Sequence, residues 1–549
     1  MRLLIILLFL FVSTKTFAED NEDNRFDCSW DDDPPCIVIP VGSLNNSNAL
    51  GDRITPTTTI TKTELREHNL IDLPSVLDYV ATLDVTQSGP RGQNGSIFLR
   101  GTNSNHTLVL LNGIPINDTS TPTGAFDVGQ DFMFNVVQVD VYKGGAGAHW
   151  GADAVGGAIN LRTTVDYDKR YNVSGNGNDK TISGNYYTRL NDFDISVSAG
   201  EHKSKNVSAL SGADEKDGTK NQTIGVNVSK WYDMIHWRTS WFTRNTFTDI
   251  DGHSLAIQDD KWADNSFYAF QTGIDYFNNS LTFHTHEYER IYDDANYDSQ
   301  NWSLRGVHQR QNWGLGFDYK HDENYGKSAW SENTGRNHGM GYFFNFSYNI
   351  LSYHHRFDED HETYKIGFLQ ELDDGLSISG SHSTSYKDKT LYSDVVYGDS
   401  QEVTLTKNNF ATTIFQNDIG DLNTNGVEMS YNTGDWKLFA SNLTSKTKDV
   451  LSLRRPEWSL GFIHNKKFEN NFTLTTNYKY KGKHLDIHNS NWSTISMPET
   501  HLVDLNLGYN YHGFNFGVSL NNLLNEKYES PHGFSQEGRK FTLGFNKSF

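Results

Sequence analysis

The chain has 549 residues, which is longer than one ordinary domain. A mean hydropathy of -0.62 and a hydrophobic content of 36 % exclude a bundle of membrane-spanning helices, and a formal net charge of -21 argues against nucleic-acid binding, which needs clustered lysine and arginine. Aromatic residues reach 13 % while prolines number only 11, a composition typical of many twisted strands.

The first segment is an apolar run, Leu3–Val12, that is too short to cross a bilayer. Arg2 precedes this run, and small and polar residues up to Ala18 follow it. This order is typical of a secretory signal peptide, so we expect residues 1–18 to be cleaved after Ala18 and the mature protein to be exported.

Residues 19–47 are acidic and polar, and predict a flexible periplasmic segment. Cys28 and Cys36 are the two cysteines of the chain, and an oxidising compartment allows them to form a disulfide across the short loop between them. A disulfide and two free thiols both fit the sequence, whereas a metal site is not expected because no histidine lies nearby. The apolar run that follows suits either a strand added to the sheet edge of a partner or the first strand of the next domain; it consists of Ile37, Val38, Ile39, Pro40 and Val41.

Residues 48–166 predict a compact α+β domain, because short β-forming runs alternate with glycine-containing turns. Thr61 or Thr63 is a candidate N-cap for a helix through Glu64, Leu65 and Arg66. A second helix is expected at Leu73–Val80, and strands are expected at Thr107–Leu111, Val136–Tyr142 and Ala158–Leu161. The glycines of the segment Gly144–Gly157 indicate tight turns, since no Lys-Ser/Thr ending or parallel βαβ unit supports a phosphate-binding loop.

Residues 167–549 consist of runs of roughly ten residues in which apolar and polar side chains alternate. Phe472, Leu474 and Tyr478 share one face of such a run, for example. A soluble β-sandwich and a membrane barrel both produce this alternation, but the length and the aromatic content favour about 22 tilted antiparallel strands closed into a barrel.

One of these runs contains the sequence HTHEYE, which raises the possibility of a metal cluster. Alternation along a strand places His284 and His286 on one face and Glu287 and Glu289 on the other. We therefore expect an ordinary barrel strand there, and no catalytic arrangement stands out elsewhere in the chain.

Three segments, Phe98–Gly101, Leu108–Gly113 and Trp150–Asn160, match the plug of TonB-dependent outer-membrane receptors in order and spacing, so the chain resembles that family. The last run, which ends on the aromatic Phe549, resembles the final strand read by the barrel-assembly machinery, and Phe516–Tyr528 resembles the penultimate strand and turn of the same receptors. The resemblance implies an all-β transmembrane barrel, 167–549, with an N-terminal α+β plug in its lumen. It also implies a bacterial outer-membrane transporter, and not an enzyme.

The resemblance further implies partners and site residues. The segment Ile37–Val41 resembles the TonB box, which binds the TonB protein of the inner-membrane energising complex, and Arg100 matches an arginine that pairs with barrel carboxylates. The ligand is expected to contact two outward-facing plug loops through Ser88, Gly89, Pro90, Arg91, Gln93, Asn94, Thr119, Ser120, Thr121 and Thr123.

The cargo expected from the resemblance is cobalamin. The plug and the order of Asp-rich loops are most similar to the cobalamin-receptor branch, whose extracellular loops bind calcium. The residues nearest to those calcium positions are Asp214, Asp217, Asp249 and Asp260. The alternatives are an iron-siderophore or haem receptor on the same scaffold and, from another class, a non-transporting adhesin or porin. We expect a monomer surrounded by outer-membrane lipid, without a catalytic cofactor.

Overall fold

The computed structural model describes residues 54–205, 207–213, 215–251, 261–292, 295–327, 332–390 and 394–549. The expected signal peptide, the cysteine pair and the segment Ile37–Val41 lie outside these residues. Val41–Phe549 forms one compact unit, and the description below concerns this unit alone. No helix in the described ranges combines the length and the apolar character needed to cross a membrane.

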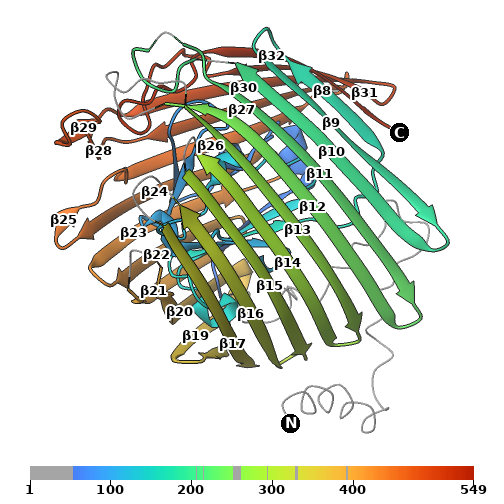
Figure 1. Cartoon of the computed structure of the whole chain (residues 1–549), viewed down its shortest axis with the longest axis vertical. Coiled ribbons are helices and arrows are strands. Elements are labelled where there is room, and N and C mark those ends of the chain that lie inside the picture. Colours follow the sequence, from blue (N-terminus) through green and yellow to red (C-terminus); the bar gives the residue numbers. More distant parts are fainter. Residues whose placement is uncertain are drawn as a thin grey trace. The chain divides into compact units, whose positions relative to one another are not determined.

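The plug is built on a mixed five-stranded sheet with the order β1-β6-β7-β4-β5, in which β4 and β7 run parallel. β2 and β3 form a separate hairpin. Figure 1 shows these N-terminal elements, coloured blue, within the ring of barrel strands. The elements are β1 (Thr57–Thr61), α3 (Lys62–Glu67), α4 (Leu73–Leu77), β2 (Leu83–Gln87), β3 (Gly95–Leu99), η3 (Ser104–His106), β4 (Thr107–Leu111), β5 (Ile114–Pro115), η4 (Val128–Gln130), β6 (Gln138–Lys143), α5 (Gly147–Trp150) and β7 (Gly157–Arg162).

The first plug helix begins where the sequence predicts. The Thr61 hydroxyl accepts the backbone N–H of Glu64, and the Glu64 carboxylate accepts the backbone N–H of Thr61 at 2.7 Å. This reciprocal pair is a capping box, which satisfies two N–H groups that the helix leaves free. The second helix ends at Leu77, three residues earlier than expected, with Asp78 as its C-cap.

The barrel is a closed antiparallel sheet of 22 strands, if the two-residue β25 is set aside, and it confirms the predicted fold class. Its strands are β8 (Arg170–Gly175), β9 (Asp179–Leu190), β10 (Phe193–Lys205), β11 (Gly218–Tyr232), β12 (Ile235–Ile250), β13 (Lys261–Tyr276), β14 (Asn279–Tyr292), β15 (Ala295–Gln309), β16 (Trp313–Lys327), β17 (Glu332–Tyr348), β18 (Leu351–Asp358), β19 (His361–Glu371), β20 (Leu376–Lys387), β21 (Val396–Lys407), β22 (Phe410–Ile419), β23 (Leu422–Asn432), β24 (Trp436–Thr447), β25 (Val450–Leu451), β26 (Trp458–Lys467), β27 (Phe472–Lys481), β30 (Thr500–Tyr511), β31 (Phe514–Asn521) and β32 (Lys540–Ser548). A short turn, η6 (Asp373–Gly375), precedes β20, and a hairpin of β28 (His484–Ile487) and β29 (Thr494–Met497) projects between β27 and β30.

The wall of the barrel is apolar outside and polar inside. Ile224 on β11 is 41 % exposed, whereas its neighbours Asn221 and Thr223 are buried toward the lumen. A soluble sandwich has the opposite arrangement, because its apolar face must leave water. An outward apolar band with a polar interior is the arrangement of an outer-membrane barrel, and closure pairs every strand edge that lipid cannot hydrogen-bond.

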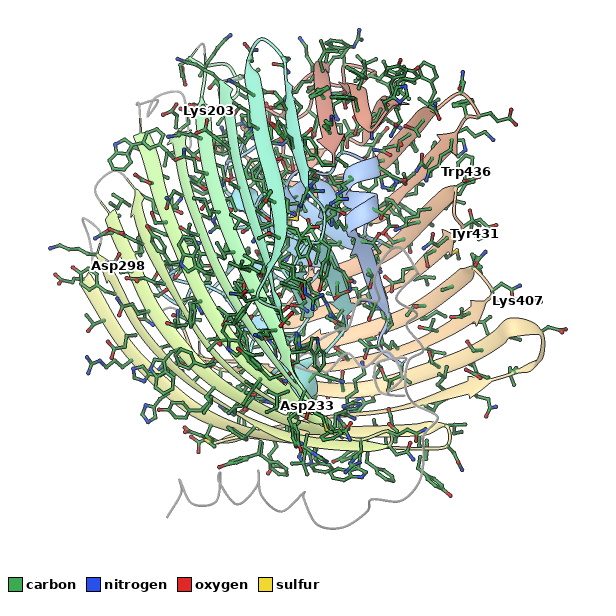
Figure 2. The ribbon with its side chains drawn as sticks, turned by 90° about the vertical axis from the view of Figure 1, so that its right-hand side faces the viewer. Lys203, Asp233, Asp298, Lys407, Tyr431 and Trp436 are labelled. Atoms are coloured by element: carbon green, nitrogen blue, oxygen red, sulfur yellow. The ribbon has the colours of Figure 1, made fainter. Side chains whose placement is uncertain are left out.

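The two ends of the barrel differ. At one end the strands are joined by tight turns, such as those at Asp233 and after Lys407 (Figure 2). At the other end they are joined by longer segments, such as that between β10 and β11. Short turns face the periplasm and long loops face the exterior in such barrels. Plug helix α3 lies at the short-turn end, where Glu67 pairs with Lys467 at 2.8 Å.

Candidate ligand-binding site

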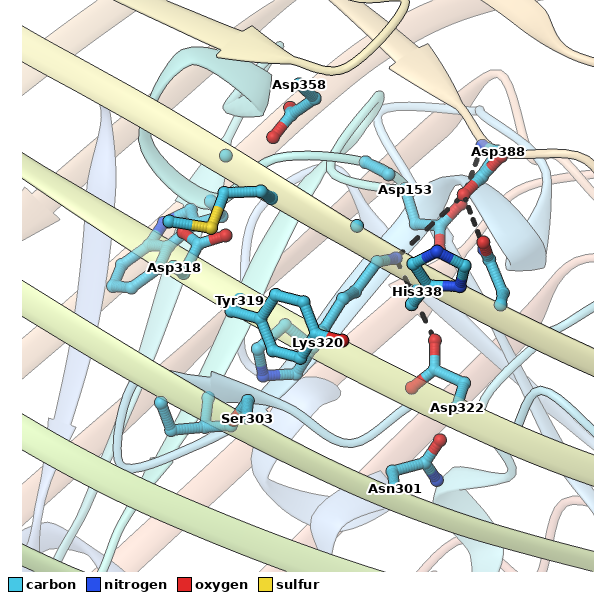
Figure 3. Close-up of a pocket in the computed structure, with 18 of the residues that line it drawn as sticks. Asp153, Asn301, Ser303, Asp318, Tyr319, Lys320, Asp322, His338, Asp358 and Asp388 are labelled. Atoms are coloured by element: carbon cyan, nitrogen blue, oxygen red, sulfur yellow. Dashed lines mark hydrogen bonds and ion pairs between the residues drawn. The ribbon is translucent and has the colours of Figure 1, made fainter. Parts of the chain in front are cut away.

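A polar cavity of about 260 Å³ lies between the plug and the inner wall of the barrel. Its floor is formed by plug residues around Trp150 and Asp153 and by the start of the loop that contains Thr119. Its wall is formed by strands β14 to β20 (Figure 3). The cavity reaches the turn between β18 and β19, which belongs to the long-loop end of the barrel.

Alternation along β16 directs Asp318, Lys320 and Asp322 into this cavity (Figure 3). Two of the residues opposite them on β17 are glycines: Gly341 faces Asp318 and Gly339 faces Lys320. A Cβ at Gly341 would lie 2.2 Å from an Arg356 nitrogen, so glycine is what admits the arginine at this point. The local sequence therefore combines charged groups on one strand with the space they need on the next.

Each basic side chain in the wall contacts carboxylates. Arg356 of β18 donates to Asp318 at 2.7 Å and to Asp358 at 2.6 Å. Lys320 lies between Asp322 and Asp388, at 4.0 and 3.9 Å. These pairs compensate the charges of the arginine and the lysine inside a poorly solvated lumen.

The edge of the cavity is formed by the turn between β18 and β19. β18 has 8 residues, while its neighbour β17 has 17, so the paired wall is lower at this position. The turn contains the acidic run Asp358–Asp360, in which Glu359 and Asp360 are exposed. Neither of these two residues makes an ion pair with another described residue.

Of the two predicted plug loops, the second one reaches the cavity. Thr119 lines it, and Ser120, Thr121 and Thr123 follow in the same turn. Asp118 holds this turn, because its carboxylate accepts the backbone N–H of Ser120 at 2.9 Å and pairs with Arg290 of β14 at 2.7 Å. The position of this loop is therefore fixed by a plug–barrel ion pair.

The first predicted loop lies apart from the cavity and is largely covered by the barrel. A Cβ on Gly89 would lie 2.6 Å from the Cβ of Ala209, and Gln93 donates to the Asp249 carbonyl at 2.6 Å. Arg91 pairs with Asp72 inside the plug. Of the other predicted residues in this loop, Ser88 is half-buried, Pro90 is buried and Asn94 is exposed.

Arg100 connects the plug to the opposite side of the barrel. It is fully buried and donates to Glu402 of β21 and to Glu428 of β23, both at 2.7 Å. Lys143 adds a second contact to Glu428 at 3.1 Å. Burial opposes the charge of the guanidinium, but Glu428 and Glu402 outweigh this effect and raise the pKa of Arg100.

The predicted calcium residues are only partly described. Asp214 and Asp260 lie outside the described residues. Asp217 gathers with Glu215 and Asp251, with carboxylate oxygens within 4.8 Å of one another. Asp249 instead accepts the backbone N–H of Gly218 at 3.0 Å. Burial, together with the negative charges of Asp251 and Glu215, raises the pKa of the Asp217 carboxyl to about 7.

The HTHEYE segment divides as the alternation predicts. His284 and His286 are buried toward the lumen, with ring nitrogens 3.1 Å apart, while Glu287 and Glu289 are exposed on the outer face. The two histidines also line the cavity, and His286 contacts Asn301 at 2.8 Å.

Sequence reasoning missed most of the cavity wall. The acidic run Asp358–Asp360 is visible in the sequence and marks a turn at the edge of the cavity. Asp318, Lys320 and Arg356 carry no such signal, because polar residues alternate with apolar ones in the same way on every lumen-facing strand.

Comparison with known proteins agrees with this architecture. Residues 50–158 match the TonB-dependent Receptor Plug Domain family. The whole fold is similar to the siderophore receptor PirA from Acinetobacter baumannii, at 14% identity and a TM-score of 0.74 over 90% of this chain and 98% of that one.

Two further solved structures are similar. The ferripyoverdine receptor of the outer membrane of Pseudomonas aeruginosa has 12% identity and a TM-score of 0.75 over 90% of this chain and 86% of that one. The ferric yersiniabactin uptake receptor FyuA from Yersinia pestis has 12% identity and a TM-score of 0.72 over 92% and 99%. At identities this low the likeness is one of fold.

The chain therefore carries a TonB-dependent receptor plug domain inside a 22-stranded barrel, which is the fold of TonB-dependent outer-membrane receptors. Its apolar outer wall and polar lumen place it in the outer membrane.

Proposed function

We propose that the protein imports a scarce metal chelate across the outer membrane, with energy supplied through TonB. The observation that carries the proposal is the plug held inside the closed barrel, with a polar cavity toward the long-loop end. A barrel closed by a plug is not an open pore, so passage needs the plug to rearrange, and the proposal does not involve making or breaking a covalent bond.

The cargo that the comparisons favour is an iron-siderophore. The similar solved structures named above are receptors for siderophores, and this supports the alternative over cobalamin, which stays an unconfirmed prediction. The His-lined part of the cavity keeps haem among the cargoes to be tested.

We further propose that TonB engages the segment Ile37–Val41 and that Arg100 acts as a holding contact which must be released when the plug is pulled. The second step is supported by the two buried ion pairs of Arg100, which join the plug to barrel strands more than 300 residues away in the sequence.

Deletion of Ile37–Val41 tests the transport proposal. Cells that depend on the protein for an iron chelate or for cobalamin as limiting nutrient should stop growing on that nutrient, while the purified variant still binds it. A deletion of equal length in the preceding acidic stretch, residues 20–24, serves as the control and should leave growth intact. Undiminished growth after the box deletion would show a passive barrel and overturn the proposal.

Calcium is proposed for the long-loop end. The group Glu215, Asp217 and Asp251 offers oxygen ligands of the kind calcium prefers, and it includes Asp217 of the predicted set. Calcium titration of the purified protein, compared with the Glu215→Gln variant, tests this proposal; equal heats of binding in both proteins would contradict it.

A further inference from the structure

The charges of the cavity give information about the cargo that the fold does not. Its lining contains Asp153 of the plug, Asp318, Asp322 and Asp388, and the acidic run Asp358–Asp360 of the edge turn. The lining bases are Arg305, Lys320 and Arg356, and Lys387 lies next to them. Seven carboxylate residues thus face four basic residues.

Three of these four bases are occupied by carboxylates. Arg305 is the exception, because its Nε has no hydrogen-bond partner among the described residues and both oxygens of its nearest carboxylate, Asp318, accept from Arg356. Arg356 and Lys320 each lie between two carboxylates, as described above. Arg305 faces Asp318 at 3.7 Å, and Lys387 donates to Asp153 at 3.1 Å. Of these four bases, an anion that entered the cavity would find a free donor only on the buried Arg305. At the other bases it would have to displace an existing carboxylate, and both anions would then compete for one cation.

The carboxylates in excess lie where a ligand would enter. Glu359 and Asp360 are exposed in the turn between β18 and β19 and form no ion pair with the rest of the described chain. The net charge of -21 adds a field of the same sign around the molecule. Negative charges at an entrance slow the approach of anions and disfavour their binding, whereas they attract cations.

We infer that the cavity accepts a metal chelate of positive or zero net charge and rejects polyanionic chelates. This inference rests on the proposed uptake function and narrows its cargo. It separates the candidate iron chelates by charge: hydroxamate complexes that are neutral or cationic fit the cavity, and triscatecholate complexes, which carry several negative charges, do not. A neutral corrinoid passes the same criterion.

Direct binding to the purified full-length protein tests the inference. The probes are cationic ferrioxamine B, neutral ferrichrome, neutral cyanocobalamin and trianionic ferric enterobactin, each titrated at low and at high salt. We expect the cation or a neutral complex to bind at least about tenfold more tightly than the trianion, and added salt to weaken the cation. Tighter binding of ferric enterobactin would overturn the inference.

A charge variant localises the effect. Glu359→Gln/Asp360→Asn removes two charges at the edge turn and should weaken ferrioxamine B about three- to tenfold at low salt, because two nearby attractive charges are lost. Asp421→Asn/Asp449→Asn removes two charges from other turns at the same end, outside the cavity lining, and should change the affinity less than about twofold. Equal effects of the two variants would overturn the assignment to this cavity.

A failure of the charge inference can be told apart from a failure of the transport proposal. Binding is measured without TonB, so a preference for the trianion contradicts only the charge inference. Growth that survives deletion of Ile37–Val41 contradicts only the proposed energised uptake, whatever the charge preference of the cavity.

Discussion

At the scale of single residues, buried charges that bridge two parts of the molecule are the most sensitive points. Arg100 belongs to the plug, yet both of its carboxylate partners belong to the barrel. Neither side is solvated, and removal of Arg100 leaves each carboxylate with one remaining cation, Lys143 for Glu428 and Lys365 for Glu402. The stability of the plug in the barrel therefore depends on this contact more than on the many exposed pairs.

Replacement of Arg100 tests this dependence. Arg100→Ala removes two buried hydrogen bonds to charged groups and leaves Glu428 with Lys143 and Glu402 with Lys365, and we expect the plug to lose about 2–3 kcal/mol of stability. Arg100→Lys keeps the charge but not both hydrogen bonds, and should lose less. The rate at which a protease cuts the plug while the barrel stays intact measures the effect.

A matched control is Arg189→Ala. Arg189 is exposed on the barrel, where its pair with Asp194 spans 3.9 Å, and an exposed pair contributes at most about 1 kcal/mol. If the two alanine variants were cut at the same rate, the Arg100 contact would not hold the plug.

Asp217 predicts a pH dependence of the loop between β10 and β11. Its pKa in the folded protein is about 7, above the ordinary value of about 4. A carboxyl with a raised pKa adds stability that is fully present below its unfolded pKa and lost as the pH rises through 7, where it becomes charged beside Asp251 and Glu215. In calcium-free buffer the loop should therefore open more readily at pH 8 than at pH 5.5.

Hydrogen exchange of the peptide that spans residues 207–217 measures this opening, once the intrinsic pH dependence of exchange is subtracted. The amide of Ala209, which donates to Asp217, is the most direct reporter. Asp217→Asn cannot ionise and should show the same opening at both pH values; a retained pH dependence in this variant would assign the effect to another group.

At the scale of elements, the sequence predicted helix starts and strands better than it predicted the contacts between distant segments. Thr61, one of the two candidate N-caps, and the strand Thr107–Leu111 were predicted from the sequence, because caps and apolar β-forming runs depend on neighbouring residues. The coverage of Gly89 by Ala209 could not be predicted, since it depends on how a barrel loop folds back over the plug. The cavity wall was missed for the same reason.

At the start of β7, the backbone conformation and close packing of Gly157 predict that a larger residue destabilises the plug. Gly157 has φ +145°, and a Cβ there would lie 2.2 Å from the Tyr142 carbonyl oxygen of β6. Gly157→Ala must push apart two central strands of the plug sheet and should destabilise the plug by about 1–3 kcal/mol. The midpoint of plug release on heating, followed by proteolysis, measures this loss.

Gly177→Ala is the matched control, because the same added methyl group at Gly177 meets nothing within 4 Å. Its effect on stability should stay within about 0.5 kcal/mol. Equal midpoints for the two variants would mean that the plug sheet tolerates the displacement and that Gly157 is not required by the packing.

At the scale of the whole molecule, the plug is attached to the barrel on several sides. Arg100 reaches β21 and β23, Asp131 pairs with Arg244 of β12, and Asp118 pairs with Arg290 of β14. Any movement of the plug that opens a path for a chelate has to break some of these contacts. The proposed import requires such a movement of the plug relative to the barrel.

A covalent tether tests that requirement. In a background of Cys28→Ser/Cys36→Ser, the pair Gly147→Cys/Ser385→Cys places a disulfide between α5 and β20, where the two Cβ positions lie 3.1 Å apart and need to move by only a few tenths of an ångström. We expect oxidation to stop uptake without weakening ligand binding, and a reductant to restore uptake.

The control tether is Thr163→Cys/Ser240→Cys, whose hydroxyl oxygens are 3.4 Å apart. Thr163 lies seven residues before β8 begins, so this disulfide fixes a part of the plug that the chain already anchors to the wall. The control should leave uptake unchanged when oxidised. Both tethers join the plug to the barrel and differ only in the length of plug that they leave free. If the protein with the oxidised Gly147–Ser385 disulfide still took up its cargo, the central plug would not need to move, and the cargo would pass by another route.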